Sequence, residues 1–270
     1  MIEDFEIEVG GARISGEQVG TGRGLIFLHA GVADRRMWRE QLMEFGQDYR
    51  AVAYDRRGFG TTRSPDERFS HGEDLGAVLD QLGMARVILA GCSQGGRIAI
   101  DFALTYPQRV EALVLIAPAI SGAPEIETLP AEIEILVEAL DRAEEADDRA
   151  QINAIEAHLW LDGPTSLQGR VGGELRELFL DMNGIALEMP DFVNEIEPAS
   201  AYARLSELSL PTLVICGDLD FPHVRARCQY LADAIPGCAL VELVGVAHLP
   251  NLEQPDAVNR LLQDFLNSAR

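Results

Sequence analysis

The pattern of apolar residues along the chain indicates strands first and strand–helix alternation afterwards. Residues 3–19 alternate apolar and polar side chains around Gly10 and Gly11, which is typical of a β-hairpin. Further on, short apolar runs predict further strands, and the run at residues 24–30 is continuous, as expected for a strand that is covered on both faces. These runs occupy residues 24–30, 49–55, 86–92, 110–119, 211–220 and 238–245.

Segments with helical periodicity separate most of these runs. They occupy residues 37–46, 71–83, 95–107, 224–237 and 255–269. Strands that alternate with helices through short joints predict an α/β fold, with a parallel sheet and helices on both of its faces.

The alternation stops between residues 121 and 203. Residues 131–161 and 172–184 have helical patterns, and no buried strand is visible in this block. Ligands of open α/β sheets bind beyond the carboxyl ends of the strands. We therefore expect a core domain of residues 1–120 and 204–270, with residues 121–203 as a helical lid over that edge. A second helical domain with its own core is the alternative.

Apolar side chains of the expected lid are candidates for a pocket lining, although such residues at helical spacing more often form a core. They are Trp160, Leu161, Leu178, Phe179, Met182, Met189 and Phe192.

The composition narrows the classes of partner. The 270-residue chain has 22 basic and 44 acidic residues, a formal net charge of −22. Such a charge repels phosphate backbones and anionic lipid headgroups, so we expect neither nucleic acid nor a membrane as partner. The sequence does not determine the oligomeric state, and a homo-oligomer is compatible with it.

Targeting and cofactor motifs are not visible. No secretory signal and no apolar run long enough to cross a bilayer is found, so we expect a cytoplasmic protein. The cysteines Cys92, Cys216, Cys228 and Cys238 lack metal-ligand spacing, and we expect free thiols and no metal. Dinucleotide and P-loop fingerprints are absent, so no cofactor is implied.

The strongest chemical motif lies where the run at residues 86–92 ends. Gly91-Cys92-Ser93-Gln94-Gly95 matches G-x-S-x-G, and a helical pattern follows at once. A serine on such a strand-to-helix turn is exposed by a strained backbone, and bulky side chains two residues away would collide. Ser93 is therefore our candidate nucleophile. Cys92 is expected to be a packed thiol, because Gln94 would clash in a turn centred on it.

A serine nucleophile needs a base and a group that orients the base. Of the five histidines, only His248 follows the last expected strand in a loop at the carboxyl edge. Asp218 and Asp220 end the neighbouring strand, and either one gives the chain order Ser, Asp, His of the nucleophile-elbow enzymes.

Two backbone N–H groups must hold the developing oxyanion. One is expected from Gln94, which follows the nucleophile. The other is expected from the loop "HAGVAD", where Gly31 is our choice and Val32 is the rival. The Gln94 side chain either binds a polar substrate atom or caps the helix.

Taken together, the stretches "LIFLHAG", "AYDRRGFGTT", "ILAGCSQGGRIAIDFALTYPQRVEALVLIAP", "PTLVICGDLD" and "VAHLPNLEQP" resemble the α/β-hydrolase superfamily. The resemblance covers nearly the whole chain. It implies an eight-stranded, mostly parallel sheet with the helical insertion after strand six, and it selects Asp220 over Asp218. The sequence departs from common members at His29-Ala30, where His-Gly is usual, and at Gln94, where an apolar residue often stands.

The resemblance also implies a reaction. The serine argues against epoxide hydrolase and haloalkane dehalogenase activity, because those enzymes use an aspartate at the elbow. The leading expectation is a serine hydrolase of a small carboxylic ester or lactone, similar to esterases and enol-lactonases. The alternatives are a C–C bond hydrolase of ring-cleavage products, a perhydrolase of the haloperoxidase type, and a ligand-binding or signalling protein with little turnover.

Overall fold

The strands of the protein form one mixed sheet, in a computed structural model that describes residues 1–126, 128–190 and 192–269. In chain order they are β1 (Glu3–Val9), β2 (Ala12–Val19), β3 (Gly24–Leu28), β4 (Arg50–Tyr54), β5 (Val87–Cys92), β6 (Val110–Ile116), β7 (Thr212–Gly217) and β8 (Ala239–Leu243). Their order across the eight-stranded sheet is β1-β2-β4-β3-β5-β6-β7-β8. β2 is antiparallel to β1 and β4, and all other neighbours are parallel. The predicted fold class is confirmed.

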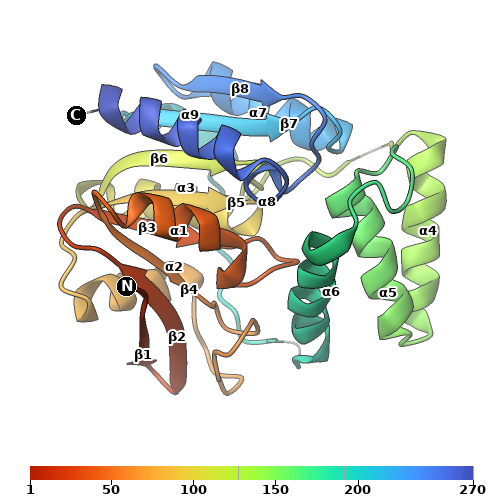
Figure 1. The fold of residues 1–270 in the computed structure, drawn as a ribbon, viewed down its shortest axis with the longest axis horizontal. Helices are drawn as coiled ribbons and strands as arrows, with labels where there is room; N and C mark the ends of the chain where they lie inside the picture. The colour runs from red at the N-terminus through yellow and green to blue at the C-terminus, as the bar shows by residue number, and fades with distance from the viewer. Residues whose placement is uncertain (127, 191, 270) are drawn as a thin grey trace.

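Helices cover both faces of the sheet (Figure 1). α1 (Arg39–Phe45) and α9 (Pro255–Ser268) lie side by side on one face, and α2 (His71–Gln81), α3 (Gln94–Thr105) and α7 (Pro222–Ala234) cover the other. Short helical turns complete the core: η1 (Arg35–Trp38), η2 (Pro107–Arg109), η4 (Tyr202–Glu207) and α8 (Pro250–Glu253). From β3 onward, each connection between consecutive strands passes through at least one helix, as the strand–helix alternation of the sequence predicts.

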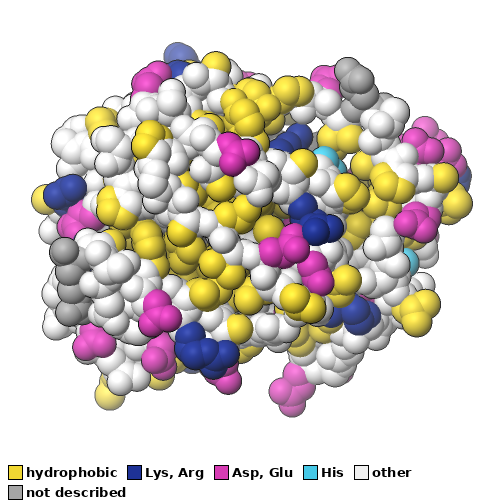
Figure 2. Space-filling model, turned by 90° about the horizontal axis from the view of Figure 1, so that it is seen from above, with side chains coloured by type: hydrophobic (Ala, Val, Ile, Leu, Met, Phe, Trp, Pro, Cys, Tyr) yellow, Lys and Arg dark blue, Asp and Glu magenta, His cyan; other side chains and the backbone are white. Residues whose placement is uncertain are grey.

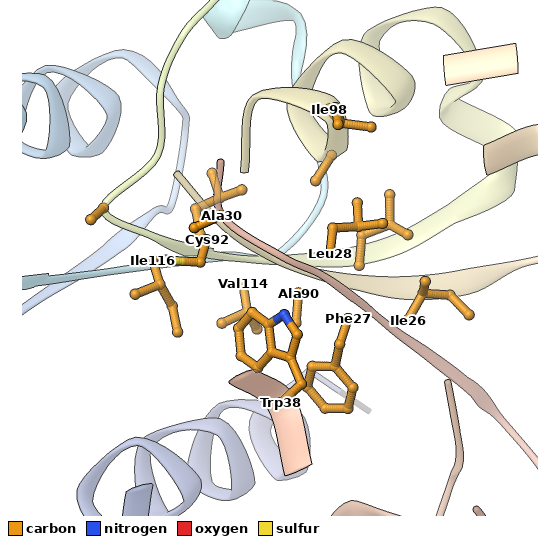
Figure 3. Close-up of a cluster of buried hydrophobic side chains, with 14 of the residues drawn as sticks. Ile26, Phe27, Leu28, Ala30, Trp38, Ala90, Cys92, Ile98, Val114 and Ile116 are labelled. Atoms are coloured by element: carbon orange, nitrogen blue, oxygen red, sulfur yellow. The ribbon is translucent and has the colours of Figure 1, made fainter. Parts of the chain in front are cut away.

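The central strands are buried on both faces, which explains their continuous apolar runs. Every residue of β3 and β5 is buried. Figure 3 shows Phe27 and Trp38 packed on one face of the sheet and Ile98 of α3 on the other. The Phe27 and Trp38 rings are stacked with their centroids 5.0 Å apart. The core is therefore continuous through the sheet and holds the carboxyl ends of the strands rigidly.

The helical block between β6 and β7 lies beside the carboxyl ends of the strands (Figure 1). It comprises α4 (Ala131–Glu145), α5 (Arg149–Glu156), the π-helical turn η3 (Ala157–Asp162) and α6 (Gly173–Glu188). The helical pattern at residues 131–161 breaks at Asp147, whose φ of 50° ends α4 before the Asp148 side chain caps α5. We call residues 121–203 the helical insertion.

The two ends of the helical insertion are joined at Ser121. Its carbonyl oxygen accepts hydrogen bonds from the backbone N–H groups of Ala201 and Tyr202, at 2.9 and 3.0 Å. Its hydroxyl donates to Asp101 Oδ2 of α3 at 2.6 Å. Asp101 therefore ties both stems of the insertion to the helix that follows Ser93.

Acidic side chains are spread over the surface rather than gathered in one patch on the face that Figure 2 shows. The described part of the chain contains no helix that combines the length and apolar character needed to cross a bilayer.

Asp101 should make stability depend on pH. Burial raises the pKa of Asp101 to about 6, while the hydrogen bond from Ser121 and the charge of Arg97 oppose the rise. The folded chain then holds a proton that the unfolded chain loses near pH 4. The stabilisation is fully present below about pH 4 and is lost as the pH rises through about 6.

We therefore expect the melting temperature of Asp101→Asn to rise relative to wild type between pH 4 and 6, and to level off above. Thermal melts at closely spaced pH values measure this difference. Asp264→Asn, at an exposed position on α9, is the matched control. A constant difference between Asp101→Asn and wild type across that window would contradict the prediction.

Candidate active site

Ser93 occupies a strained turn between β5 and α3. Its φ and ψ are 52° and −115°, in a region that residues other than glycine rarely adopt. The backbone is held on both sides: the Ser93 N–H donates to the Ile116 carbonyl oxygen at 2.9 Å, and the Ser93 carbonyl oxygen accepts from the Ala119 N–H at 3.0 Å. This geometry is that of a nucleophile elbow.

The two glycines of the motif are required by close backbone contacts. A Cβ on Gly91 would lie 2.3 Å from the carbonyl oxygen of Gly95. A Cβ on Gly95 would lie 2.1 Å from the carbonyl oxygen of Leu28. Neither position accepts a side chain without a backbone shift. Cys92 between them is fully buried in the core, as expected of a packed thiol, and burial raises the pKa of its thiol.

His248 is paired with Asp220. Its Nδ1 lies 2.8 Å from Asp220 Oδ2, and both side chains are almost completely buried. The carboxylate only accepts, so Nδ1 donates, and in the neutral imidazole the lone pair is then on Nε2. The second carboxylate oxygen accepts from the Phe221 N–H at 2.7 Å, which fixes the orientation of Asp220. Asp218 has a different partner, the Gly245 N–H at 2.7 Å.

Ser93 and His248 line one cavity of about 210 Å³ at the carboxyl edge of the sheet. The other residues that line it are Gly31, Val32, Gln94, Glu156 and Trp160. The predicted oxyanion residues thus lie beside the predicted nucleophile and base, and Gly31 and Val32 both remain candidates. His29, His71, His158 and His223 are not among the residues that line this cavity.

Arg56 holds the Gln94 side chain by hydrogen bonds. Both terminal guanidinium nitrogens of Arg56 donate to Gln94 Oε1 at 3.2 Å, and Nη2 also donates to the carbonyl oxygens of His29 and Ala30. Burial lowers the pKa of Arg56 to about 10, which still leaves it charged at neutral pH. Because Arg56 fixes the amide oxygen, the Gln94 amide nitrogen is free to donate; it has no acceptor among the described residues.

Trp160 connects the helical insertion to the candidate base. Its ring lies against the imidazole of His248, with centroids 4.6 Å apart, and its carbonyl oxygen accepts from the His248 N–H at 3.3 Å. Of the apolar residues that the sequence suggested for a pocket lining, Trp160 lines this cavity. Leu161, Phe179 and Met182 are buried in the core instead.

Glu156 is a cavity residue that sequence analysis missed. It ends α5, and its Oε2 accepts a hydrogen bond from Asn183 Nδ2 at 2.6 Å. Burial and the charge of Glu144 raise the pKa of Glu156, and the bond from Asn183 opposes the rise. The sequence carries no signal for this placement, because one more glutamate in a charge-rich helix is typical of a solvated face.

A metal site requires a cluster of metal-ligating side chains. Within the described ranges, no three histidine, cysteine, aspartate or glutamate side chains are grouped as metal ligands.

Comparison with known proteins extends these observations. A model of the Alpha/beta hydrolase family matches residues 25–261. The chain is 28% identical over 269 residues to a putative 2-succinyl-6-hydroxy-2,4-cyclohexadiene-1-carboxylate synthase of Bacillus subtilis, covering 94% of both chains. It is 26% identical to carboxylesterase YbfK of the same organism, over 90% of this chain and 79% of the relative.

A solved structure is similar throughout. The crystal structure of a hydrolase from Pseudomonas aeruginosa superposes with a TM-score of 0.78 at 26% identity, covering 97% of this chain and 98% of that one. The family model spans well over half of the chain. The chain therefore belongs to the alpha/beta hydrolase family and is a hydrolase, as its sequence predicts.

Proposed function

We propose that the protein is a cofactor-independent serine hydrolase of small carboxylic esters or lactones, which acts through an acyl-enzyme with Ser93, His248 and Asp220 as its catalytic triad. The observation that carries this proposal is the shared cavity: Ser93 on a strained elbow and His248, which is paired with the buried Asp220, line the same space. Similarity to a carboxylesterase supports the choice of an ester bond.

The proposed acylation step uses the three side chains together. His248 Nε2 takes the proton of the Ser93 hydroxyl while its oxygen attacks the substrate carbonyl carbon. Asp220 holds the imidazole in the required tautomer and stabilises the imidazolium that forms. The Gln94 N–H and the N–H of Gly31 or Val32 would bind the oxyanion. The bond to the leaving oxygen then breaks, and His248 returns its proton to that oxygen.

Deacylation uses the same groups in the reverse direction. His248 takes a proton from a water molecule, whose oxygen attacks the acyl carbon. The bond to Ser93 Oγ then breaks, and His248 gives the proton to that oxygen, which restores the serine hydroxyl. The products are a carboxylic acid and an alcohol, or a hydroxy acid when the substrate is a lactone. No group outside the chain and water is required.

The helical insertion is proposed to act as a lid. Trp160 supports this role, because its ring and carbonyl oxygen contact the candidate base directly. An aromatic wall on the imidazole would exclude bulk water from the carbonyl site, which strengthens the electrostatic interactions there.

The triad proposal predicts different effects for two neighbouring aspartates. Asp220→Asn should lower kcat by about 10⁴-fold, because the amide stabilises the wrong histidine tautomer. Asp218→Asn should change kcat by less than about threefold, since its amide oxygen still accepts from the Gly245 N–H. Steady-state hydrolysis of p-nitrophenyl acetate measures both. Equal losses in the two variants would contradict the assignment of Asp220.

The bond specificity is tested with a substrate panel. We expect turnover of short-chain p-nitrophenyl esters or small lactones, and slower or no cleavage of a 2-hydroxy-6-oxo-dienoate. A burst of p-nitrophenol equal to the enzyme concentration is expected wherever deacylation limits the rate. Faster cleavage of the dienoate would favour C–C hydrolysis. Folded protein that turns over no member of the panel would favour a binding role.

A further inference from the structure

The acidic residue in the cavity has no role in the chemistry proposed above. Glu156 ends α5 and lines the cavity with Ser93 and His248. The π-helical turn η3 begins at the next residue, and it presents Trp160 to the same cavity four residues on. Short π-helical turns inside helices often mark functional positions, because they redirect side chains. The local backbone thus aims an acid and an aromatic ring at one site.

Amide side chains hold Glu156 in position. Asn183 of α6 is 2% exposed, and its Nδ2 donates both to Glu156 Oε2, at 2.6 Å, and to Asn153 Oδ1, at 3.0 Å. Asn153 Nδ2 donates in turn to the carbonyl oxygen of Leu180 at 2.8 Å. This chain of hydrogen bonds fixes one carboxylate oxygen and its direction. A glutamate that only filled space between α5 and α6 would not need these hydrogen bonds to fix its direction.

The other carboxylate oxygen is open to a ligand. Among the residues that the structure describes, Glu156 Oε1 has no hydrogen-bond donor, and no arginine lies within ion-pair distance of the carboxylate. The charge that contributes to its raised pKa is that of Glu144, which is also acidic. A partly desolvated carboxylate without a counter-charge favours a donor or a cation and repels an anion.

We infer that Glu156 determines the specificity of this site: it selects esters or lactones that carry a hydroxyl or ammonium group, and it disfavours those that carry a second carboxylate. The inference rests on the proposed hydrolase function for its substrates. It assigns Glu156 no part in bond breaking. Glu156 Oε1 accepts a hydrogen bond from the substrate while Ser93 attacks the carbonyl elsewhere in the cavity.

The test compares matched substrates. Two series are used, para-substituted phenyl acetates and methyl para-substituted benzoates, each bearing an ethyl, hydroxymethyl, aminomethyl or carboxymethyl group. The two series place the substituent on the alcohol side and on the acyl side of the ester. Ratios of kcat/KM between enzyme variants cancel the intrinsic reactivity of each ester.

For wild type we expect the aminomethyl ester to exceed the carboxymethyl ester by at least about tenfold in kcat/KM in one series. Glu156→Gln should lower that ratio by about tenfold, while the ethyl ester changes by less than about threefold. Glutamine keeps the shape and still accepts from Asn183. Glu145→Gln, which removes an exposed charge on α4 that does not shift the pKa of Glu156, is the matched control and should leave the ratio unchanged.

Two results would overturn the inference. One is a wild-type enzyme without preference for aminomethyl over carboxymethyl in either series, which decides the question even when Glu156→Gln does not fold. The other is a folded Glu156→Gln variant that hydrolyses the ethyl ester and keeps the wild-type ratio.

Binding separates this inference from the proposed function. Calorimetric titration of Ser93→Ala with the same esters, with and without Glu156→Gln, requires no turnover. Suppose that wild type hydrolyses none of the esters, whereas Ser93→Ala binds the aminomethyl compound about tenfold more tightly than the carboxymethyl compound and loses this preference with Glu156→Gln. The proposed reaction is then wrong and the proposed specificity stands. Equal affinities for the aminomethyl and carboxymethyl compounds in Ser93→Ala reject the specificity, whatever the reaction is.

Discussion

The strained backbone at Ser93 is the constraint on which the site depends. A positive φ at a serine persists only where surrounding contacts leave the chain no relaxed alternative. Here the Ile116 carbonyl and the Ala119 N–H hold the residue from β6 and its loop, and Gly91 and Gly95 allow the backbones to approach. All of β5 is buried, as is β6 except for Glu111, and this packing makes these contacts rigid. The stability of the sheet therefore fixes the position of the Ser93 hydroxyl.

The surroundings of the elbow divide into two parts with different origins. The sheet supplies Ser93, Gln94, Asp220 and His248 from the segments that follow strand ends, where the fold fixes their positions. The helical insertion supplies Glu156 and Trp160, which reach the same cavity from α5 and η3. Because the insertion is tied back through Ser121 to Asp101 on α3, its side chains keep a defined relation to the elbow. We therefore propose that residues beside the sheet determine the reaction type, and that residues of the helical insertion determine which substrate is chosen.

The sequence predicted the parts of the structure that depend on local patterns. Continuous apolar runs gave the parallel strands, and the hairpin around Gly10 and Gly11 was found as β1 and β2. The strand after residue 110 ends earlier than its apolar run, at Ile116, because Ala117 adopts a φ of 44° in the turn beside Ser93. Ser93 and His248 were recognisable because each follows a strand end, and strand ends meet at one edge of a sheet.

Residues whose role depends on tertiary contacts were not predictable. Neither the pairing of Glu156 with Asn183 nor the support of Gln94 by Arg56 leaves a periodic or motif-level signal, since the partners lie 27 and 38 positions apart. The sequence left Asp218 and Asp220 open until the resemblance selected Asp220, which the structure pairs with His248. The choice between Gly31 and Val32 depends on where an oxyanion would sit, and both line the cavity.

The central claim is that Ser93 is a nucleophile activated by the His248–Asp220 pair. Labelling with a fluorophosphonate, followed by peptide mapping in a mass spectrometer, tests it most directly. The account predicts one adduct per chain, on the peptide that contains Ser93, and none in a folded His248→Ala variant under the same conditions. Labelling at another residue, or undiminished labelling of Ser93 without His248, would contradict it.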